Sequence, residues 1–387
     1  MRKLLIFIFP FSSLPMLAQI NSIKLAAEMG QTHILDDFTS VQMWGYGIIK
    51  PSGAYSASLP GPVLEFNLGD TVEIHFYNYS PEDHTIHLHG LDVSQAEDGV
   101  PMTSVAVDPN DSIVYNFVAN NAGTFLYHCH VLTTLHLTMG MYGVIVVKNF
   151  PEQNLMYPGG PSFNKEHVFL TSDMDLSINT NPLSPGPFNL LVMDYFMVNG
   201  LSGNQLYTDG EHQITAYPGD SVLLRLGSMG YSSTRYIFPA EVNAICYASD
   251  GRTLPAPIDA DTLIIYPGER YDVLLTPTAI TDVDIQVEYY ESRNNQLQHI
   301  NYINLNADVQ IAAQNKTELE IFPNPSIGVI TVVSNAIGEQ LIITDITGQI
   351  IYRTIINSDS QQIDFSNYAN GIYILTCGNR SKKIIKR

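Results

Sequence analysis

The sequence has little cysteine, little tryptophan and few charged residues, and each shortage excludes a class of protein. Its 387 residues include three cysteines and one tryptophan. Three cysteines are too few for the disulfide framework of a small secreted domain, so apolar burial must hold the chain together. Charged residues make up only 14% of the sequence and hydrophobic residues 45%. This balance excludes an intrinsically disordered chain.

Basic residues are scarcer than acidic ones. The 18 lysines and arginines are outnumbered by 38 aspartates and glutamates, which gives a formal net charge of −20. Phosphate backbones and anionic lipids repel such a chain, so we exclude nucleic acid and anionic membrane surfaces as main partners. The length favours two or three domains over one.

Long apolar runs are also absent, and the one near the start is short. Arg2 and Lys3 precede an apolar run from Leu4 to Leu17, which two prolines interrupt. The run is too short to span a membrane core of about 30 Å. Its features are typical of a secretory signal over residues 1–18, ending at Ala18. We therefore predict an exported, soluble protein without a membrane span.

The apolar pattern of the remaining chain is that of strands, because no long helical periodicity occurs. Val72, Ile74 and Phe76 alternate with polar residues after a turn at Gly69-Asp70, as in a half-buried strand. Residues of about 160–308 show the same pattern of a turn followed by a short strand, for example at Gly219-Asp220 before Val222. We predict an all-β fold with two tandem antiparallel β-sandwiches and a small C-terminal β-sandwich. The predicted domains are 19–152, 160–308 and 318–387.

The C-terminal unit has its own motifs. They are the opening Phe322-Pro323-Asn324-Pro325, the turn from Asp345 to Gly348, the step Asn370-Gly371-Ile372-Tyr373, and a lysine-rich last strand. Together they resemble the C-terminal sorting domain of type IX secretion substrates, over about 320–387. The resemblance implies a Gram-negative source, the type IX secretion machinery as a partner, and a secreted or cell-surface location. It implies nothing about chemistry.

Six of the eleven histidines crowd into two short stretches. One stretch is His84-Thr85-Ile86-His87-Leu88-His89-Gly90, and the other is His128-Cys129-His130 followed by His136. On a strand, successive side chains point to opposite faces. His87 and His89 should therefore share one face, as should His128 and His130, with Cys129 on the opposite face. We predict a metal site at the histidine face and a second one at Cys129.

Cys129 needs further ligands, and His84, His136 and Met141 are the candidates. A thiolate with two imidazoles and a weak axial thioether is the ligand set of a blue, type 1 copper. Met139 is a second candidate for the axial position. Hard cations would not select sulfur, and zinc would not need the methionine.

These two stretches resemble the multicopper oxidases. His-x-x-His-x-His-Gly and His-Cys-His-x(5)-His-x(4)-Met are close to the motifs of that family's blue-copper domain. The second domain resembles the copper-free middle domain of three-domain oxidases through Ala248-Ser249-Asp250-Gly251 and the segment from Tyr266 to Asp272. The resemblance implies two tandem cupredoxin-like Greek-key β-sandwiches or barrels.

The resemblance also implies roles for individual residues. His84, Cys129, His136 and Met141 would bind the type 1 copper, His87 the type 2 copper, and His89, His128 and His130 the type 3 pair. Asp98 would supply protons near this trinuclear cluster. A small-molecule or protein reductant would deliver electrons at the exposed edge of His136. The electrons would pass through Cys129 to His128 and His130, where O2 becomes water.

The trinuclear cluster of this family uses eight histidines, four from each of two domains. This chain supplies four, and its second domain contains no His-x-His. An isologous contact between the first domains of two chains would bring four histidines from each chain to one shared site. We therefore predict a homodimer that completes the cluster.

Two other functions remain open. A copper nitrite reductase also combines a blue copper with a histidine site between chains, but that family has Asp near the position of His87 and lacks a second His after the Cys. A cupredoxin-like electron-transfer or copper-binding protein would use only His84, Cys129, His136 and Met141. The sequence does not identify the reducing substrate.

Overall fold

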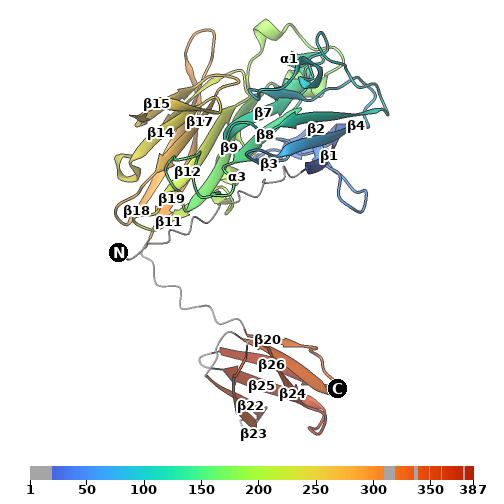
Figure 1. The fold of residues 1–387 in the computed structure, drawn as a ribbon, viewed down its shortest axis with the longest axis vertical. Coiled ribbons are helices and arrows are strands. Elements are labelled where there is room, and N and C mark those ends of the chain that lie inside the picture. The colour runs from blue at the N-terminus through green and yellow to red at the C-terminus, as the bar shows by residue number, and fades with distance from the viewer. Residues whose placement is uncertain (1–19, 309–318, 335–338, 348, 359, 378–379) are drawn as a thin grey trace, which may run out of the picture. The chain divides into compact units, whose positions relative to one another are not determined.

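The computed structural model describes residues 20–308, 319–334, 339–347, 349–358, 360–377 and 380–387. The predicted signal, residues 1–18, lies outside the described residues, as does Gly348 of the predicted turn. The chain divides into two compact units, Met1–Val309 and Gln310–Arg387. Figure 1 shows both units, and each is described by itself.

The first domain is a sandwich of two four-stranded sheets. Their strand orders are β2-β1-β4-β6 and β3-β8-β7-β5. The strands are β1 (Ile20–Ile34), β2 (Ser40–Ile48), β3 (Leu64–Asn67), β4 (Thr71–Asn78), β5 (His87–His89), β6 (Ser112–Val118), β7 (Gly123–His128) and β8 (Tyr142–Lys148). Val72, Ile74 and Phe76 of β4 are fully buried between the sheets, while the alternate residues of β4 are partly exposed. The period-2 pattern thus sets which face of the strand enters the core.

The second domain packs a six-stranded sheet against a five-stranded one. Their orders are β10-β9-β12-β17-β14-β15 and β11-β19-β18-β13-β16. The strands are β9 (Lys165–Met174), β10 (Tyr195–Val198), β11 (Ile214–Ala216), β12 (Val222–Ser228), β13 (Ser233–Ile237), β14 (Ala244–Ser249), β15 (Arg252–Asp259), β16 (Thr262–Ile265), β17 (Arg270–Leu275), β18 (Thr281–Tyr290) and β19 (Leu297–Ala307). Cys246 of β14 is a buried member of this core.

Helices are short in the part of the chain that the structure describes. The α-helices are α1 (Thr133–Thr138), α2 (Leu176–Thr180) and α3 (Gly203–Thr208), and the 3-10 helices are η1 (Gln95–Glu97), η2 (Phe188–Leu190) and η3 (Ala240–Val242). None of the described helices has the length and apolarity needed to cross a membrane. The prediction of an all-β fold is confirmed.

The expectation of purely antiparallel sandwiches is wrong. β1 runs parallel to β4 and β3 parallel to β8 in the first domain, while β9 runs parallel to β12 and β11 to β19 in the second. Between the two strands of each of these pairs the chain passes through the opposite sheet, so no hairpin turn forces them to be antiparallel. Alternation shows which face of a strand is buried, but not which strand lies beside it.

The two domains share a further apolar core. It joins residues such as Leu126 and Val144 of the first domain to Leu170 and Met197 of the second. All six residues of β7 are buried, because one face of the strand packs into its own domain and the other onto the second domain. The strand that leads into His128 and Cys129 is therefore held on both faces.

A buried ion cluster extends this interface. Arg225 of β12 is 1% exposed, and its Nε lies 2.5 Å from Glu166 Oε1 while its Nη1 lies 3.4 Å from Asp272 Oδ2. Thr124 of the first domain donates a 2.5 Å hydrogen bond to Asp272. Burial raises the pKa of the Asp272 carboxyl, and the charge of Arg225 opposes that shift. Arg225 thus compensates two carboxylates at the junction of the domains.

We expect Arg225→Met to lower the free energy of unfolding by about 3–5 kcal/mol, because removing one partner of a buried pair leaves an uncompensated charge. Arg252→Met is the matched control. Its ion pair with Asp92 is exposed, with side chains 42% and 64% accessible, and is worth about 0–1 kcal/mol. Urea unfolding followed by circular dichroism measures both. Equal losses in the two variants would contradict a role for the buried cluster.

The C-terminal unit is a small sandwich of its own. Its sheets have the orders β20-β21-β24 and β23-β22-β25-β26. The strands are β20 (Leu319–Phe322), β21 (Val329–Ser334), β22 (Gln340–Asp345), β23 (Ile350–Ile355), β24 (Ser360–Asp364), β25 (Gly371–Cys377) and β26 (Arg380–Lys386). Its core includes Ile330, Leu341 and Phe365, all fully buried.

Candidate metal centre

Three separate elements bring a thiol and two imidazoles together. Cys129 directly follows β7, His136 lies on α1, and His84 lies in the loop before β5. The Cys129 N–H donates to the carbonyl of Met141 at 3.1 Å, and the Met141 N–H donates to the carbonyl of His136 at 2.9 Å. These backbone bonds join the two ends of the segment from Cys129 to Met141, so that the segment forms a closed loop.

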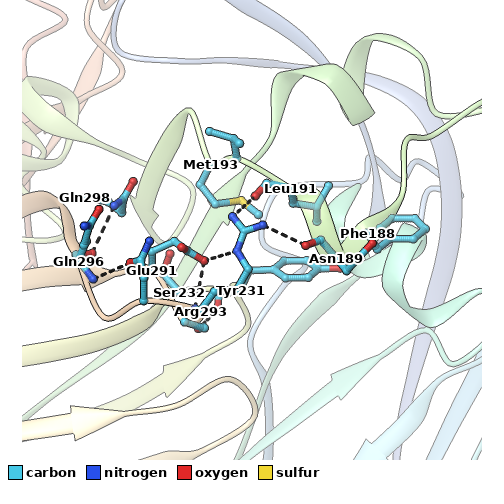
Figure 2. A pocket seen from close by; sticks show the side chains of 13 residues that line it. Phe188, Asn189, Leu191, Met193, Tyr231, Ser232, Glu291, Arg293, Gln296 and Gln298 are labelled. Carbon is cyan, nitrogen blue, oxygen red and sulfur yellow. Dashed lines mark hydrogen bonds and ion pairs between the residues drawn. The ribbon is translucent and has the colours of Figure 1, made fainter.

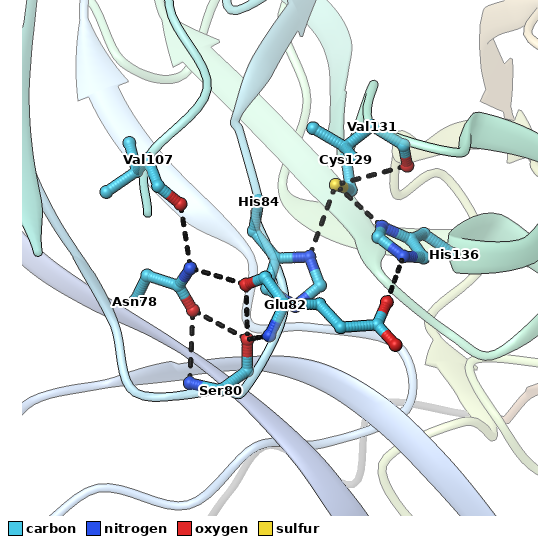
Figure 3. A network of polar contacts seen from close by, with 8 residues as sticks. All are labelled: Asn78, Ser80, Glu82, His84, Val107, Cys129, Val131 and His136. Atoms are coloured by element: carbon cyan, nitrogen blue, oxygen red, sulfur yellow. Dashed lines mark hydrogen bonds and ion pairs between the residues drawn. The ribbon is translucent and has the colours of Figure 1, made fainter. Parts of the chain in front are cut away.

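The donor atoms of these residues converge. Cys129 Sγ lies 3.5 Å from His84 Nδ1 and 3.1 Å from His136 Nδ1 (Figure 3). All three side chains are fully buried. One soft sulfur and two imidazole nitrogens in a dry pocket match the donor preference of copper rather than that of a hard cation. The residues present therefore fit a copper ion, which they would bind through Sγ and the two Nδ1 atoms.

Burial sets the protonation of this group. It lowers the pKa of His84 to about 3, and the neighbouring His136 adds to the effect. It also lowers the pKa of His136, although the Glu82 carboxylate opposes that shift. Burial raises the pKa of the Cys129 thiol. Both imidazoles are thus neutral and ready to bind a metal, whereas the thiol gives up its proton only when a metal takes its place.

The loop that carries His84 is held by a buried amide. Asn78 is fully buried, and its Nδ2 donates to the carbonyls of Glu82 at 2.7 Å and Val107 at 2.8 Å. Ser80 Oγ donates to Asn78 Oδ1 at 2.7 Å, as Figure 3 shows. This network fixes Glu82, whose Oε2 lies 3.4 Å from His136 Nε2. Nδ1 of His136 therefore lies beside the thiol, and Nε2 of the same ring lies beside a carboxylate.

The prediction that one edge of His136 is exposed is wrong, because the side chain is completely buried. The indole of Trp44 on β2 packs edge-on against its ring, with 5.5 Å between ring centroids and 74° between planes. Glu82 covers Nε2. Trp44 and Glu82 are residues near the site that the sequence did not reveal. The only signals were that Trp44 is the single tryptophan and that Glu82 stands two positions before His84.

Both methionine candidates for the axial position are fully buried in the core of the first domain. The backbone carbonyl of Met141 accepts a hydrogen bond from the Cys129 N–H. The backbone carbonyl of Met139 accepts a 2.9 Å hydrogen bond from the backbone N–H of Trp44. The choice of Met141 as the axial ligand stays a prediction.

Of the other four histidines, His87 and His89 lie on β5 and His128 ends β7, whereas His130 follows two residues after that strand. β5 pairs antiparallel with β7, with His87 opposite His128 and His89 opposite Leu126. Their ring centroids are 4.9 Å apart for His87 and His128 and 5.5 Å apart for His89 and His128. Leu88 faces the opposite way into the core at 1% exposure. One nitrogen each from His87, His89 and His128 lies within 4.8 Å of the others.

His130 lies at the edge of this four-histidine cluster. Its ring is 5.3 Å from that of His87 and 5.9 Å from that of His128. Its N–H donates to Thr85 Oγ1 at 2.9 Å. His128 and His130 flank Cys129 in the chain. The backbone of Cys129 therefore links its buried thiol covalently to two members of the cluster.

Polar contacts orient the cluster's rings. His87 Nδ1 lies 2.8 Å from the carbonyl oxygen of Asp98 and 3.2 Å from Asp98 Oδ1. His128 Nδ1 lies 3.0 Å from the carbonyl oxygen of Cys129. A carbonyl only accepts, so in both rings Nδ1 carries the proton and Nε2 is an acceptor that can bind a metal; the Nε2 of His128 lies 3.3 Å from His89 Nδ1. Asp98 thus lies beside His87, and its role in supplying protons stays a prediction.

The second domain touches this cluster although it supplies no histidine to it. Gly268 packs against His89, where an added Cβ would lie 3.2 Å from the ring. The guanidinium of Arg270, 3% exposed, packs on Gly90 and would collide with a Cβ there. Burial lowers the pKa of His89 to about 4, and the positive charge of Arg270 contributes. Burial also lowers the pKa of His128 to about 3.

Thr85 directly follows the candidate ligand His84, and its hydroxyl accepts a hydrogen bond from His130 of the cluster. We expect Thr85→Val to lower the free energy of unfolding. Valine has the same shape but leaves the part-buried His130 N–H without its acceptor, the buried Thr85 hydroxyl, which should cost about 1–3 kcal/mol. Thr208→Val is the control, because Thr208 is exposed and bonds only within its own helix, so its loss should stay within about 0.5 kcal/mol. Urea unfolding of the metal-free protein measures both, and an unchanged midpoint for Thr85→Val would refute the assignment.

Comparisons with protein families find two matches in the larger unit. Residues 46–152 match a family model described as multicopper oxidase, and residues 176–306 match a second model with the same description. Residues 320–387 match the model of the secretion system C-terminal sorting domain.

Individual relatives agree with these matches. The chain is 26% identical to Laccase-9 of Arabidopsis thaliana over 227 residues, which are 57% of this chain and 37% of that protein. It is 39% identical to multicopper oxidase MCE of Talaromyces pinophilus over 212 residues, which are 54% of this chain and 33% of that protein. The chain thus spans less than half the length of these curated relatives.

Among solved structures, the blue copper oxidase from Nitrosomonas europaea is 26% identical with a TM-score of 0.59. The similarity covers 75% of this chain and 86% of that chain.

Proposed function

The chain belongs to the multicopper oxidase family, and we propose that it is a copper-dependent oxidoreductase that passes electrons from a reductant to O2. One observation carries the proposal. Cys129 Sγ converges with His84 and His136, and its two chain neighbours belong to a four-histidine cluster. The solved structure from Nitrosomonas europaea, of which the similarity covers 86%, is named a blue copper oxidase, and that name supports the proposal.

Each residue then has a part. His84, Cys129 and His136, with Met141 as the axial ligand, would hold a type 1 copper. His87 would hold a type 2 copper, and His89, His128 and His130 a type 3 pair. Bound copper supplies one-electron acceptance at the first site and O2 reduction at the second. The chain itself fixes these sites from both sides, through the doubly packed β7 and the Asn78 network.

The chain also shapes the route between the sites. The peptide from Cys129 to His128 and His130 is short and covalent, and His128 Nδ1 turns back to the Cys129 carbonyl at 3.0 Å. Asp98 orients His87 through its carbonyl and places a carboxylate at the cluster, where a proton could be held near O2. Four electrons and four protons convert one O2 to two waters.

The cluster has only half of the histidines that the trinuclear site of this family uses. We propose that a second copy of the chain supplies the rest through an isologous contact between first domains. His87 is partly exposed, with 19% of its side chain accessible, and His89 and His130 are also partly exposed. Their edges are thus open to a partner.

The proposed setting is outside the cell. The sorting domain at 320–387 supports export to the medium or the cell surface of a Gram-negative organism. The predicted signal at 1–18 would start that route.

Oxygen uptake by the copper-loaded protein tests the function. A one-electron donor added without air should bleach a visible absorption, and air should restore it. Nitrite turnover without oxygen uptake would instead identify a nitrite reductase. A monomer that bleaches but is not reoxidised by air would identify an electron carrier or a copper-binding protein.

A further inference from the structure

A pocket in the second domain has a lining that the metal centre does not explain. It measures about 430 Å³ and lies between η2 and the turn that joins β18 to β19 (Figure 2). Small-molecule sites usually have volumes of about 300–1,000 Å³, so the pocket is large enough to hold a ligand. Within the described part of the chain, the residues that line it include none of the candidate copper ligands.

One wall of the pocket is apolar and fixed in place. Phe188, Met193 and Tyr231 are partly buried and pack against the core of the first domain, and Leu191 is a buried member of that core. The rings of Phe188 and Tyr231 give this wall flat apolar surfaces. The wall therefore lies where the segment around η2 meets the first domain, and junctions between domains are common positions for ligand sites.

The guanidinium of Arg293 spans the pocket and joins its two sides. It donates to the backbone carbonyl of Asn189 at 2.9 Å and to that of Leu191 at 2.8 Å. Its Nε lies 2.6 Å from Glu291 Oε1. Hydrogen bonding from Arg293 lowers the pKa of Glu291, so the carboxylate stays ionised and offsets the positive charge. The two charged residues of the described lining thus add no net charge to the pocket.

Side-chain amides supply the other polar groups. Those of Asn189, Asn294, Gln296 and Gln298 belong to the lining. In Figure 2, Gln296 and Gln298 lie on one side of the Arg293 guanidinium and Asn189 lies on the other. Among the residues that the structure describes, the amides of Asn189 and Gln296 have no hydrogen-bond partner. Each of these amides therefore has donors and an acceptor to offer to a ligand.

This combination favours a neutral molecule with several hydroxyl groups. An apolar ligand would remove water from the amides without replacing their hydrogen bonds. An anion would lie beside Glu291 in a chain of net charge −20, and a cation would lie beside Arg293. A hydroxyl both donates and accepts, as an amide does. The C–H face of a pyranose ring is apolar and can lie on an aromatic ring.

We propose that this pocket binds a neutral saccharide, with a pyranose ring on the aromatic wall and its hydroxyls on the amides of Asn189 and Gln296. The proposal concerns binding alone, because no bond of the sugar is made or broken, and it does not rest on the proposed function. A free sugar and a polysaccharide present the same rings, so the experiment must distinguish these two sources.

Binding is measured on the copper-free full chain, where no oxidase activity contributes. The probes are maltose, cellobiose and lactose, which differ in linkage or in one hydroxyl. We expect saturable binding of at least one of them by titration calorimetry, with saturation transfer from the protein to its ring protons in NMR. Additional retention of the protein on insoluble starch or cellulose would identify a polysaccharide, and binding of a disaccharide alone would identify a free sugar. No saturable binding of any probe would overturn the proposal.

A matched pair of variants locates the site. Gln296→Leu removes an amide from the pocket and should weaken binding of the sugar about fivefold. Gln42→Leu is the control, because Gln42 is also an exposed glutamine but lies on β2, outside this pocket. Its affinity for the sugar should equal that of the wild type. An unchanged affinity in Gln296→Leu, or the same loss in both variants, would refute this location.

The preference for a neutral sugar has its own measurement. Methyl glucoside and methyl glucuronide differ in the charge of one group, and the wild type should bind the glucuronide more weakly. Glu291→Gln keeps an acceptor for Arg293 but leaves its charge without compensation, so binding of the glucuronide should tighten about fivefold. Binding of the glucoside should stay within about twofold. A wild-type protein that prefers the glucuronide would overturn the assignment to neutral sugars.

Discussion

Cys129→Ser is expected to abolish the visible colour of the copper-loaded protein and to lower oxygen uptake by more than about 100-fold. Even the loss of a residue that only supports a metal ligand costs up to about 100-fold, and this change removes a ligand. The intense absorption of a blue copper arises from its bond to a thiolate, which a serine hydroxyl does not replace. Absorption spectra and an oxygen electrode measure the two effects.

The control for this experiment is Cys246→Ser. Cys246 is also fully buried, but it lies in the core of the second domain, where its Sγ lies 3.4 Å from the Ala248 carbonyl. Both changes put a hydroxyl where a buried thiol stood, so both should reduce stability to a similar degree. Only Cys129→Ser should lose colour. Colour retained in Cys129→Ser, or lost in both variants while both stay folded, would refute the type 1 assignment.

Strand alternation explains why so much of this centre was predictable. The spacing His-Leu-His and His-Cys-His requires that the histidines share one face and that Leu88 and Cys129 share the other, whatever the rest of the fold does. The structure has this arrangement across the β5–β7 pair. Local spacing on a strand thus separates the four histidines from Cys129, whereas His84 in a loop and His136 on α1 were candidates by ligand type alone.

The surroundings of the centre depend on contacts that spacing does not encode. His136 is buried because Trp44 comes from β2, more than ninety positions earlier in the chain, and because the Asn78 network holds Glu82 against it. The same limit applies to the parallel strand pairs and to Arg270, which reaches Gly90 from the second domain. Each is a long-range contact, and a single sequence gives only the propensities of its segments.

His89→Ala should separate the two sites. His89 belongs to the histidine cluster, whereas Cys129, His84 and His136 form a separate group of candidate ligands among the described residues. The variant should therefore keep its colour and still be bleached by a donor, yet fail to be reoxidised by air. Its copper content should fall from about 2.5 ions per chain, the value for a cluster shared by two chains, to about one.

His75→Ala is the control for this change. His75 is also a partly exposed strand histidine, on β4, and its Nε2 lies 3.2 Å from Glu73 Oε2. It should keep both the copper content and the reoxidation by air. Wild-type protein with one copper per chain and no reoxidation would instead identify an electron carrier, and normal reoxidation of His89→Ala would remove that histidine from the cluster.

Mixing chains decides whether the cluster is shared. If two chains build one cluster, a single His89→Ala chain disables every dimer that it enters. An equal mixture of wild-type and variant chains, allowed to exchange before copper is added, should then keep about a quarter of the wild-type oxygen uptake, because only a quarter of the dimers have two intact chains. Complete clusters within single chains would keep about half. Retention of half the uptake would thus reject the two-fold site even if the protein sediments as a dimer.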